Sequence, residues 1–445
     1  MLGEKKLKQI AQKVLTFSEA NQTEVVMVVS QNGLTRFANS QIHQNVAWND
    51  LGISVRAVIG KKIGVASTNS FEDKALKVLV QRAINLAKLQ KDDPYFESLP
   101  KPQAYQPASQ DVYRISEKER ASAVAVIIKK AKAKAIVASG AYQSAVSELA
   151  VANSLGVWAY HTSSSVDLST ILLGANSTGF AAQVGKKAQD IDASAVAELA
   201  IDKVVTSANP IDVEPGEWDV VLEPQAVSEM MAFFNWLGPN ARIYHEKASY
   251  FSGKLEKKVL GENVTIIDDP THKDAFPMPF DFEGYPKAKL EIIKNGVLTN
   301  ICYDSYNARR YKAKNTGHAL PAPNTAGPIP LHVYIAPGTK SRNQMIKSVK
   351  KGLLVTRLWY VRVLNPRSLA ITGMTRDGTF LIKNGKIVAA VKNLRFNQSI
   401  PQALQNVVAV ENKLTPIASF ESEMGINRLP ALLIRNWQFS SGTLF

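Results

Sequence analysis

The sequence predicts an α+β protein, with an N-terminal α/β-type domain of hairpins and helices and a β-rich C-terminal domain of barrel-like or sandwich-like form. Three observations lead to this fold class. The first half alternates amphipathic helical segments with strand-like runs. From about residue 211, strand and turn patterns dominate. Two Asn-Gly pairs in the second half lie between apolar runs, which is typical of β-hairpins. We therefore place the domains at residues 1–211 and 212–445.

The N-terminal domain is expected to begin with a helix and two hairpins. Residues 4–17 have the apolar spacing of an amphipathic helix. The next run predicts a hairpin that turns at Asn32-Gly33, because this pair accepts the positive φ angles of a type I′ turn. A second hairpin turns around Gly60. A helix of about five turns follows at residues 71–89.

A loop rich in proline and glutamine, residues 94–110, leads to the rest of this domain. Ser116 and Glu119 have the spacing of a capping box and open the next helix. The elements predicted after it are strands at 142–154, 156–174 and 177–185 and a helix at 193–208.

The C-terminal domain is expected to combine hairpins with a few helices. An apolar helix is predicted at residues 224–238, and Asn295-Gly296 and Asn384-Gly385 each mark a tight turn. A capping box at Ser341 opens a further helix that we expect to stop at Gly352. A last short helix begins at Ser399.

Composition narrows the class of protein. Cys302 is the only cysteine, which excludes an internal disulfide framework and an all-cysteine zinc cluster. No apolar run approaches the roughly 18 residues that span a bilayer, and the N-terminus lacks a signal-peptide pattern. We expect a cytoplasmic protein without membrane contact. The net charge of +15 is spread along the chain, so solvated helix faces are favoured over nucleic-acid binding.

The pair His245-Glu246 is typical of the start of a zinc-peptidase motif. A second histidine at i+4 would share a helix face with His245, but that position is Ser249. The i+5 position is Tyr250, an infrequent zinc ligand. Cys302 could supply a thiolate, although it falls within a predicted strand. We predict no metal in this chain and treat His245 and Glu246 as catalytic candidates only, the alternative being a surface His-Glu pair.

A second candidate is the tract 280–284, FDFEG. Asp281 and Glu283 would share one face of a strand, where paired carboxylates could act as acid and base or hold a cation. The alternative, which we favour, is a turn fixed by Gly284 that leads into the following hairpin.

Two further candidates are expected to bind substrate. His318 lies in a predicted loop of small residues and prolines, and loops on a rigid scaffold often carry binding residues. Arg376 could bind a peptide carboxylate in bidentate fashion, whereas a local ion pair with Asp377 is the alternative.

Several tracts together resemble the TldD/PmbA family. They include KASYFSGKLEKKVLGENVTIIDDP, PFDFEGYPKAKLEIIKNGVLTNICYDSYNARRYKAKNTGHA and TGMTRDGTFLIKNGKIVAAVKNLRFNQS, with a weaker likeness near the N-terminus. The resemblance implies a family that pairs two similar chains. The TldD type carries a His-Glu-x-x-x-His zinc motif with a cysteine near its C-terminus and cleaves small or unfolded peptides. The PmbA type, also called TldE, lacks this motif and completes the assembly.

This sequence departs from the TldD motif at two points, and in both it resembles the PmbA type. Tyr250 stands where the second histidine of the motif would be, and the segment after residue 411 has no cysteine. The resemblance therefore implies a non-metal-binding subunit that completes a peptide-binding cavity, with zinc only in a TldD-type partner. An extended peptide could add to a strand edge of the C-terminal domain. The alternatives are a non-enzymatic peptide- or protein-binding homodimer, or an active metallopeptidase with an atypical site.

Overall fold

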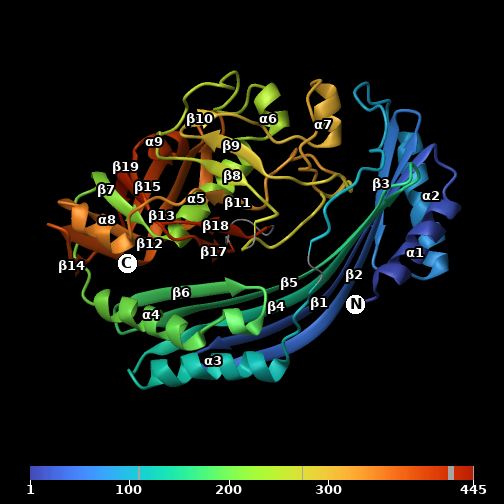
Figure 1. Cartoon of the computed structure of the whole chain (residues 1–445). Helices are drawn as coiled ribbons and strands as arrows, with labels where there is room; N and C mark the ends of the chain where they lie inside the picture. Colours follow the sequence, from blue (N-terminus) through green and yellow to red (C-terminus); the bar gives the residue numbers. More distant parts are fainter. Residues whose placement is uncertain (109–110, 273, 419–424, 444–445) are drawn as a thin grey trace.

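A computed structural model describes residues 1–108, 111–272, 274–418 and 425–443. It confirms the α+β fold class. Figure 1 shows a long, curved N-terminal sheet lying against a second body of shorter strands and helices. No helix in these ranges has the length and apolar character needed to span a membrane.

The N-terminal sheet is antiparallel, with strand order β3-β2-β1-β4-β5-β6. Its strands are β1 (Gln22–Ala38), β2 (Gln41–Ile59), β3 (Lys62–Thr68), β4 (Val137–Asn153), β5 (Trp158–Leu173) and β6 (Thr178–Gly185). Four helices and one 3₁₀ turn belong to this part: α1 (Glu4–Phe17), α2 (Asp73–Leu89), α3 (Glu117–Lys132), η1 (Ala188–Asp190) and α4 (Ala193–Thr206). The four helices cover the convex face, so the concave face is turned toward the C-terminal part (Figure 1).

The C-terminal part contains two sheets. In the larger sheet, the pairing of β12 with β13 closes a ring of five strands, β12-β7-β19-β15-β13, which confirms the expected barrel-like character. Its strands are β7 (Gly216–Leu222), β12 (Lys351–Asn365), β13 (Ala370–Lys383), β14 (Lys386–Ala390), β15 (Leu394–Ser399), β16 (Val407–Val410) and β19 (Leu432–Gly442). The smaller sheet has the order β10-β9-β8-β11-β18-β17.

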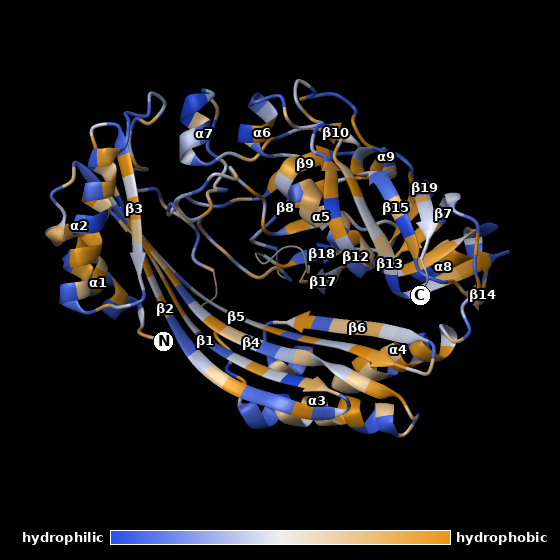
Figure 2. Ribbon diagram, turned by 180° about the vertical axis from the view of Figure 1, so that it is seen from behind, coloured by the Kyte–Doolittle hydropathy of each residue, from blue (hydrophilic) through white to orange (hydrophobic). Residues whose placement is uncertain are grey.

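The strands of the smaller sheet are β8 (Ile266–Asp268), β9 (Leu290–Lys294), β10 (Val297–Leu298), β11 (Val333–Ile335), β17 (Thr415–Ile417) and β18 (Asn427–Leu429). The helices are α5 (Pro224–Leu237), α6 (Ala241–His245), α7 (Ser305–Arg310), α8 (Arg342–Ser348) and α9 (Ile400–Gln405). Figure 2 shows α5 as mostly hydrophobic and α6 and α7 as mostly hydrophilic, which matches the burial of Met230 and Phe234 in the core. Burial of this apolar helix holds the two sheets together.

The local signals with a definite mechanism are confirmed. Ser116 caps α3, and Ser341 caps α8, each within a capping box. Asn295-Gly296 and Asn384-Gly385 both turn with positive φ angles, 47° and 80° in the first pair and 49° and 75° in the second.

The turn predicted at Asn32-Gly33 is wrong. Both residues lie inside β1, and the chain turns at Asn39 and Ser40, with φ angles of 50° and 57°. Gly33 is required for a different reason: a Cβ there would lie 2.1 Å from Nη1 of Arg120, which is buried over the strand. The glycine therefore permits a close approach, not a turn.

Gly352 is a second glycine that permits a close approach. The helix α8 ends at Ser348, before the predicted stop, and Gly352 lies in β12. A Cβ at Gly352 would lie 2.5 Å from the carbonyl oxygen of Asp219 on the neighbouring strand. Its small size serves strand packing.

Candidate functional site

The concave face of the N-terminal sheet changes character along its strands. Directly opposite residues of antiparallel strands point to the same face, so each row across the sheet can be read from the register. Glu24 lies opposite Arg56, Val26 opposite Val151, and Ser30 opposite Ser147. The same face thus passes from charged to apolar to hydroxyl-bearing rows.

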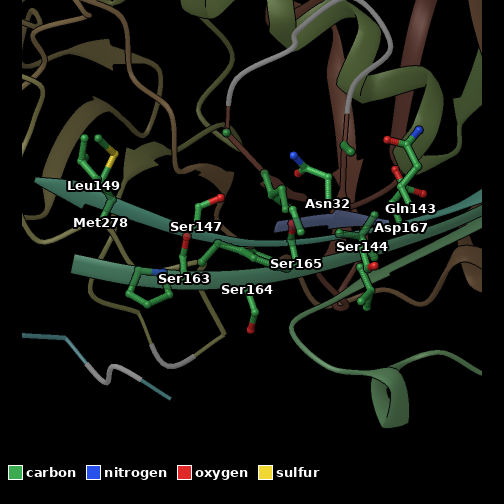
Figure 3. A pocket seen from close by; sticks show the side chains of 18 of the residues that line it. Asn32, Gln143, Ser144, Ser147, Leu149, Ser163, Ser164, Ser165, Asp167 and Met278 are labelled. Carbon is green, nitrogen blue, oxygen red and sulfur yellow. The ribbon is translucent and has the colours of Figure 1, made fainter. Parts of the chain in front are cut away.

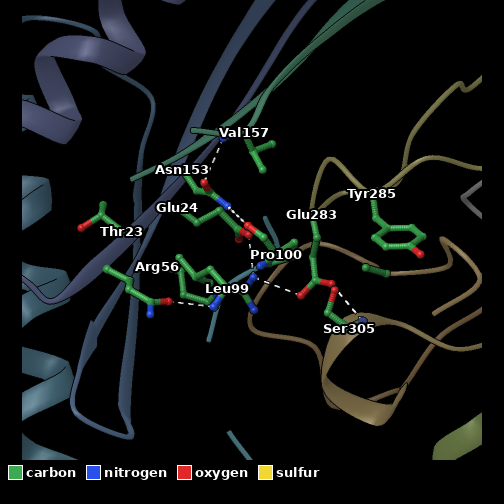
Figure 4. Close-up of polar contacts among 12 residues, drawn as sticks. Thr23, Glu24, Arg56, Leu99, Pro100, Asn153, Val157, Glu283, Tyr285 and Ser305 are labelled. Carbon is green, nitrogen blue, oxygen red and sulfur yellow. Dashed lines mark hydrogen bonds and ion pairs between the residues drawn. The ribbon is translucent and has the colours of Figure 1, made fainter. Parts of the chain in front are cut away.

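The charged row binds the C-terminal part through one arginine. Nη2 of Arg56 lies 2.6 Å from Oε2 of Glu24 and 3.1 Å from Oε1 of Glu283, and all three side chains are largely buried (Figure 4). The other oxygen of Glu283 accepts a hydrogen bond from the backbone N–H of Ser305. Burial raises the pKa of Glu24 to about 7, although the charge of Arg56 opposes this. Two acids therefore share one counter-ion across the boundary.

Glu283 is positioned by the turn that the sequence favoured over a strand. Oδ1 of Asp281 accepts hydrogen bonds from the backbone N–H groups of Glu283 and Tyr285, and Gly284 has a φ of 73°. Burial, together with the nearby charge of Glu283, raises the pKa of Asp281 to about 8. These contacts give both carboxylates a structural task, and their role toward a substrate stays a prediction.

Beyond the apolar row, around Val26 and Phe280, the two parts separate and leave a cleft. One cavity of about 510 Å³ lies between the sheet and the loop at Phe276 to Met278. A second cavity of about 640 Å³ reaches β6, Arg357 and Trp359. The two cavities share the lining residues Gln143, Asp167, Val184 and Ala418. We call this connected space the inter-sheet cleft.

The floor of the inter-sheet cleft carries a row of polar side chains along β4 and β5. Alternate residues of β5 lie on the concave face, where Ser163 is opposite Ser147 and Asp167 is opposite Gln143. Figure 3 shows these side chains on the cavity side of their strands, whereas Ser164 points away and donates to the carbonyl oxygen of Lys186. Neutral hydroxyl and amide groups can hydrogen-bond an extended backbone without selecting its sequence.

Two titratable groups of β5 lie at this floor without full partners. Oδ1 of Asp167 and Nε2 of His161 are buried, and neither has a hydrogen-bond partner among the described residues. Burial raises the pKa of Asp167 to about 6 and lowers that of His161. Sequence reasoning missed both residues. The alternation of polar residues through YHTSSSVDLS, residues 160–169, is the signal that could have indicated a polar strand face.

His245 and Glu246 lie elsewhere, at the end of α6. Nε2 of His245 is 2.8 Å from the hydroxyl of Tyr303, and its ring stacks on Tyr311 with centroids 3.8 Å apart. Glu246 accepts a hydrogen bond from Arg242 at 3.3 Å. Glu246 and Glu283 both line another cavity, of about 640 Å³, so the structure brings these two predicted site residues to one space.

The tract after His245 is not helical, contrary to the spacing argument. Ser249 donates to the carbonyl oxygen of Gly238, and the hydroxyl of Tyr250 accepts from Gln405. Within residues 1–108, 111–272, 274–418 and 425–443, no three His, Cys, Asp or Glu side chains form a group that could hold a metal ion. Nε2 of His245 and the hydroxyl groups of Ser249 and Tyr250 thus have hydrogen-bond partners within the fold, and none of these three atoms is free to bind the zinc that the family motif implies. That this chain holds no metal stays a prediction.

His318 is fully buried, so it does not present itself as an open loop residue. Its Nε2 lies 3.1 Å from Oδ2 of Asp268, and its Nδ1 lies 2.8 Å from the hydroxyl of Thr316. Nζ of Lys287 is 3.5 Å from the same Asp268 oxygen, and the backbone N–H of His332 donates to the other. Burial opposes ionisation of Asp268, but Lys287 and His318 hold its pKa well below the usual range. This cluster gives the C-terminal part an internal charge network.

Arg376 is half-exposed and lies over the ring of Trp359, 5.0 Å from its centroid. The alternative predicted for Arg376 was a local ion pair with Asp377. Nε of Arg376 does lie 3.9 Å from Oδ2 of Asp377, but the shorter ion pair of this carboxylate is with Nη2 of Arg357, at 2.7 Å. The bulge at Asp377, with a φ of 57°, explains the difference because it turns this carboxylate toward the neighbouring strand. Arg357, which the sequence did not indicate as a candidate, lines the inter-sheet cleft.

Comparison with known proteins identifies the family. Residues 215–441 match the PmbA/TldA metallopeptidase C-terminal domain, and residues 23–87 match domain 1 of the same family. A metalloprotease PmbA homolog of Haemophilus influenzae is 24% identical over an alignment 423 residues long, which covers 89% of this chain and 89% of the relative. A metalloprotease TldD homolog of Buchnera aphidicola is 28% identical over 227 residues, 49% of this chain and 44% of the relative.

The fold is shared with a solved relative. The crystal structure of TldE from Thermococcus kodakarensis matches with a TM-score of 0.89 at 20% identity, covering 98% of this chain and 99% of that chain. The family resemblance drawn from the sequence is thus confirmed by the matched domains and by the fold. The chain belongs to the PmbA/TldA metallopeptidase family.

Proposed function

We propose that this chain is the metal-free subunit of a two-chain peptidase assembly of its family, and that it completes the cavity that binds small or unfolded peptides. The observation that carries the proposal is the engaged state of His245. Its Nε2 is hydrogen-bonded to Tyr303 and its ring is stacked on Tyr311, so a metal bound at Nε2 would have to displace the hydrogen bond to Tyr303. The TldD-type partner would supply the zinc.

The inter-sheet cleft supports the peptide-binding half of the proposal. Its volume suits several residues of an extended chain, and its polar floor imposes little side-chain selection. β17 is the last strand in the order of the smaller sheet, and Pro416 and Ile417 line the cleft. A peptide in the cleft could therefore pair with this strand edge, as expected for main-chain recognition in the C-terminal part.

The test measures bound metal and peptidase activity of the purified chain, alone and mixed with a TldD-type chain. We expect no stoichiometric zinc in the chain alone, and cleavage of an unstructured peptide only in the mixture. Zinc in the chain alone that is lost in His245→Ala, but kept in a His43→Ala control on the exposed face of β2, would contradict the proposal. A cytoplasmic location belongs to the same proposal and is checked by cell fractionation.

A second candidate function, a peptide-binding homodimer without catalysis, is favoured by the cleft itself, since such binding needs no metal. Two outcomes together would support it: peptide binding and self-association by the chain alone, and no cleavage with any TldD-type chain.

A further inference from the structure

Among the described residues that line the inter-sheet cleft, Asp167 is a half-buried acid whose Oδ1 is buried without a hydrogen-bond partner. It lies near the middle of β5, opposite Gln143 on one side and Val184 on the other. It also lines both cavities of the cleft. A ligand in either cavity can therefore lie next to this side chain.

A buried carboxylate oxygen without a partner is costly, and native proteins rarely keep one without a reason. Oδ1 of Asp167 is such an atom among the described residues. Its neighbours on the same face, Ser165 and Ser169, are neutral, as are the opposite residues Gln143 and Val184. None of these four neighbours therefore offers a charge that would explain the acid as part of the fold.

The cation that lines the same cleft is already committed. Arg357 lies 2.7 Å from Asp377, with its guanidinium 4.4 Å from the ring centroid of Phe180 and 4.7 Å from that of Trp359. These contacts fix its charge on another carboxylate. Of the positions outside the described ranges, only Lys273 is basic.

Other acids on the concave face have partners, which makes Asp167 an exception. Glu24 shares Arg56 with Glu283. Asp50, at the exposed edge of the sheet, accepts hydrogen bonds from Nε1 of Trp48 and from Nδ2 of Asn32. The missing partner of Asp167 is consequently the one that a ligand would bring.

We propose that Asp167 recognises a positively charged group of the bound peptide, a lysine or arginine side chain or the α-ammonium group. This inference rests on the proposed peptide-binding function and specifies its substrate class. A cationic group would form a charge-assisted hydrogen bond with Oδ1, while the serine and glutamine side chains around it bind the neutral backbone. The burial that raises the pKa of this carboxyl agrees with a site whose counter-ion arrives with the ligand.

The test compares two peptides that differ in one charge. A capped four-residue peptide with a central lysine, Ac-Ala-Lys-Ala-Ala-NH₂, is matched by its norleucine analogue of nearly equal length and apolar surface. Binding is measured calorimetrically with the full chain, alone and in the mixture with a TldD-type chain. We expect a preference of about ten-fold or more for lysine at pH 8, which Asp167→Asn reduces to within about two-fold.

Two control variants isolate the effect. Asp50→Asn removes an acid from the same sheet face and should leave the preference unchanged, as should Lys273→Gln. Equal binding of the two peptides by the unaltered chain, or a preference that survives in Asp167→Asn, would overturn the inference. Absence of binding of both peptides would overturn it as well.

The two proposals fail separately. If the lysine and norleucine peptides bind equally but zinc and cleavage appear only in the mixture, the inference falls and the proposed function stands. If the chain alone holds zinc through His245, the metal-free subunit is wrong, while a lysine preference lost in Asp167→Asn still supports the recognition role.

Discussion

The acids at the two ends of the concave sheet face differ in whether they have partners. At one end, Glu24 and Glu283 are held by Arg56 across the boundary between the two parts. At the other end, Asp167 faces a cavity and its Oδ1 has no partner in the described ranges. Both ends belong to the same sheet and follow the same alternation of side chains. The difference lies in the C-terminal part, which presents a turn carrying Glu283 at one end and open space at the other.

The comparison indicates which charges serve the fold and which are available for a ligand. A buried ion pair resists the loss of one member because the other is left without compensation. An acid with a buried, unpartnered carboxylate oxygen gives the opposite expectation, since neutralising it removes an unfavourable charge. Removal of one charge should therefore destabilise the chain at the Arg56 end and stabilise it at the Asp167 end.

The largest effect is expected from a substitution that removes the ion pairs at the Arg56 end. Arg56→Met leaves Glu24 and Glu283 buried together without a cation, and we expect the free energy of unfolding to fall by about 3–5 kcal/mol. Urea denaturation measures it. The exposed Arg36 on the neighbouring strand β1 provides the control, since Arg36→Met should change stability by less than about 0.5 kcal/mol. Equal small losses in both variants would show that Arg56 does not hold the two parts together.

The second largest effect is expected at the unpaired end, where the stability change caused by Asp167→Asn should depend on pH. The folded-state pKa of Asp167 is raised to about 6 from 3.8, so the folded chain binds more protons than the unfolded chain between these values. Stability contributed by this group is thus greatest below pH 3.8 and is lost as pH rises through about 6. We expect Asp167→Asn to be about 1–3 kcal/mol more stable than the unaltered chain at pH 8, with the advantage shrinking toward pH 4.

Denaturation curves of Asp167→Asn and the unaltered chain at pH 8, 6 and 4.5 check this pattern. Asp50→Asn is the matched control, because Asp50 is exposed and hydrogen-bonded, and its substitution should give no stabilisation at pH 8. A destabilised Asp167→Asn at pH 8 would mean that the carboxylate has a counter-ion within the fold, and the contrast between the two ends would disappear.

Local chemistry explains what the sequence could predict. Capping boxes and type I′ turns depend on residues close in the chain, so Ser116, Ser341 and the Asn-Gly pairs at 295 and 384 were predictable. Gly33 and Gly352 misled because a glycine that permits close packing looks the same in sequence as one that permits a turn. Their partners, Arg120 and Asp219, are distant in the chain.

The candidate site was harder to predict for the same reason. The family tracts correctly indicated the fold class and the family, but the inter-sheet cleft forms where β5 meets residues of the C-terminal part. The partnered state of His318 depends on Asp268 and Lys287, and that of Asp377 on Arg357. Sequence spacing contains no information on these long-range contacts, so it could not distinguish engaged charges from available ones.

The smallest effect is expected at His245, which is only partly buried, and it tests whether the partners of this side chain stabilise the fold. His245 has a hydrogen bond to Tyr303 and a stacking contact with Tyr311, and burial lowers its pKa with a further contribution from the charge of Arg310. Tyr303→Phe removes the hydroxyl partner and should cost about 0.5–1.5 kcal/mol of stability. Tyr311→Phe keeps the stacked ring and is the matched control, with a change near zero. If Tyr303→Phe instead left stability unchanged and gave the chain stoichiometric zinc, the hydrogen bond would be a block on metal binding and not a stabilising contact. That result would move His245 from the class of paired groups to the class of groups with an unpartnered ring or carboxylate atom, such as Asp167 and His161.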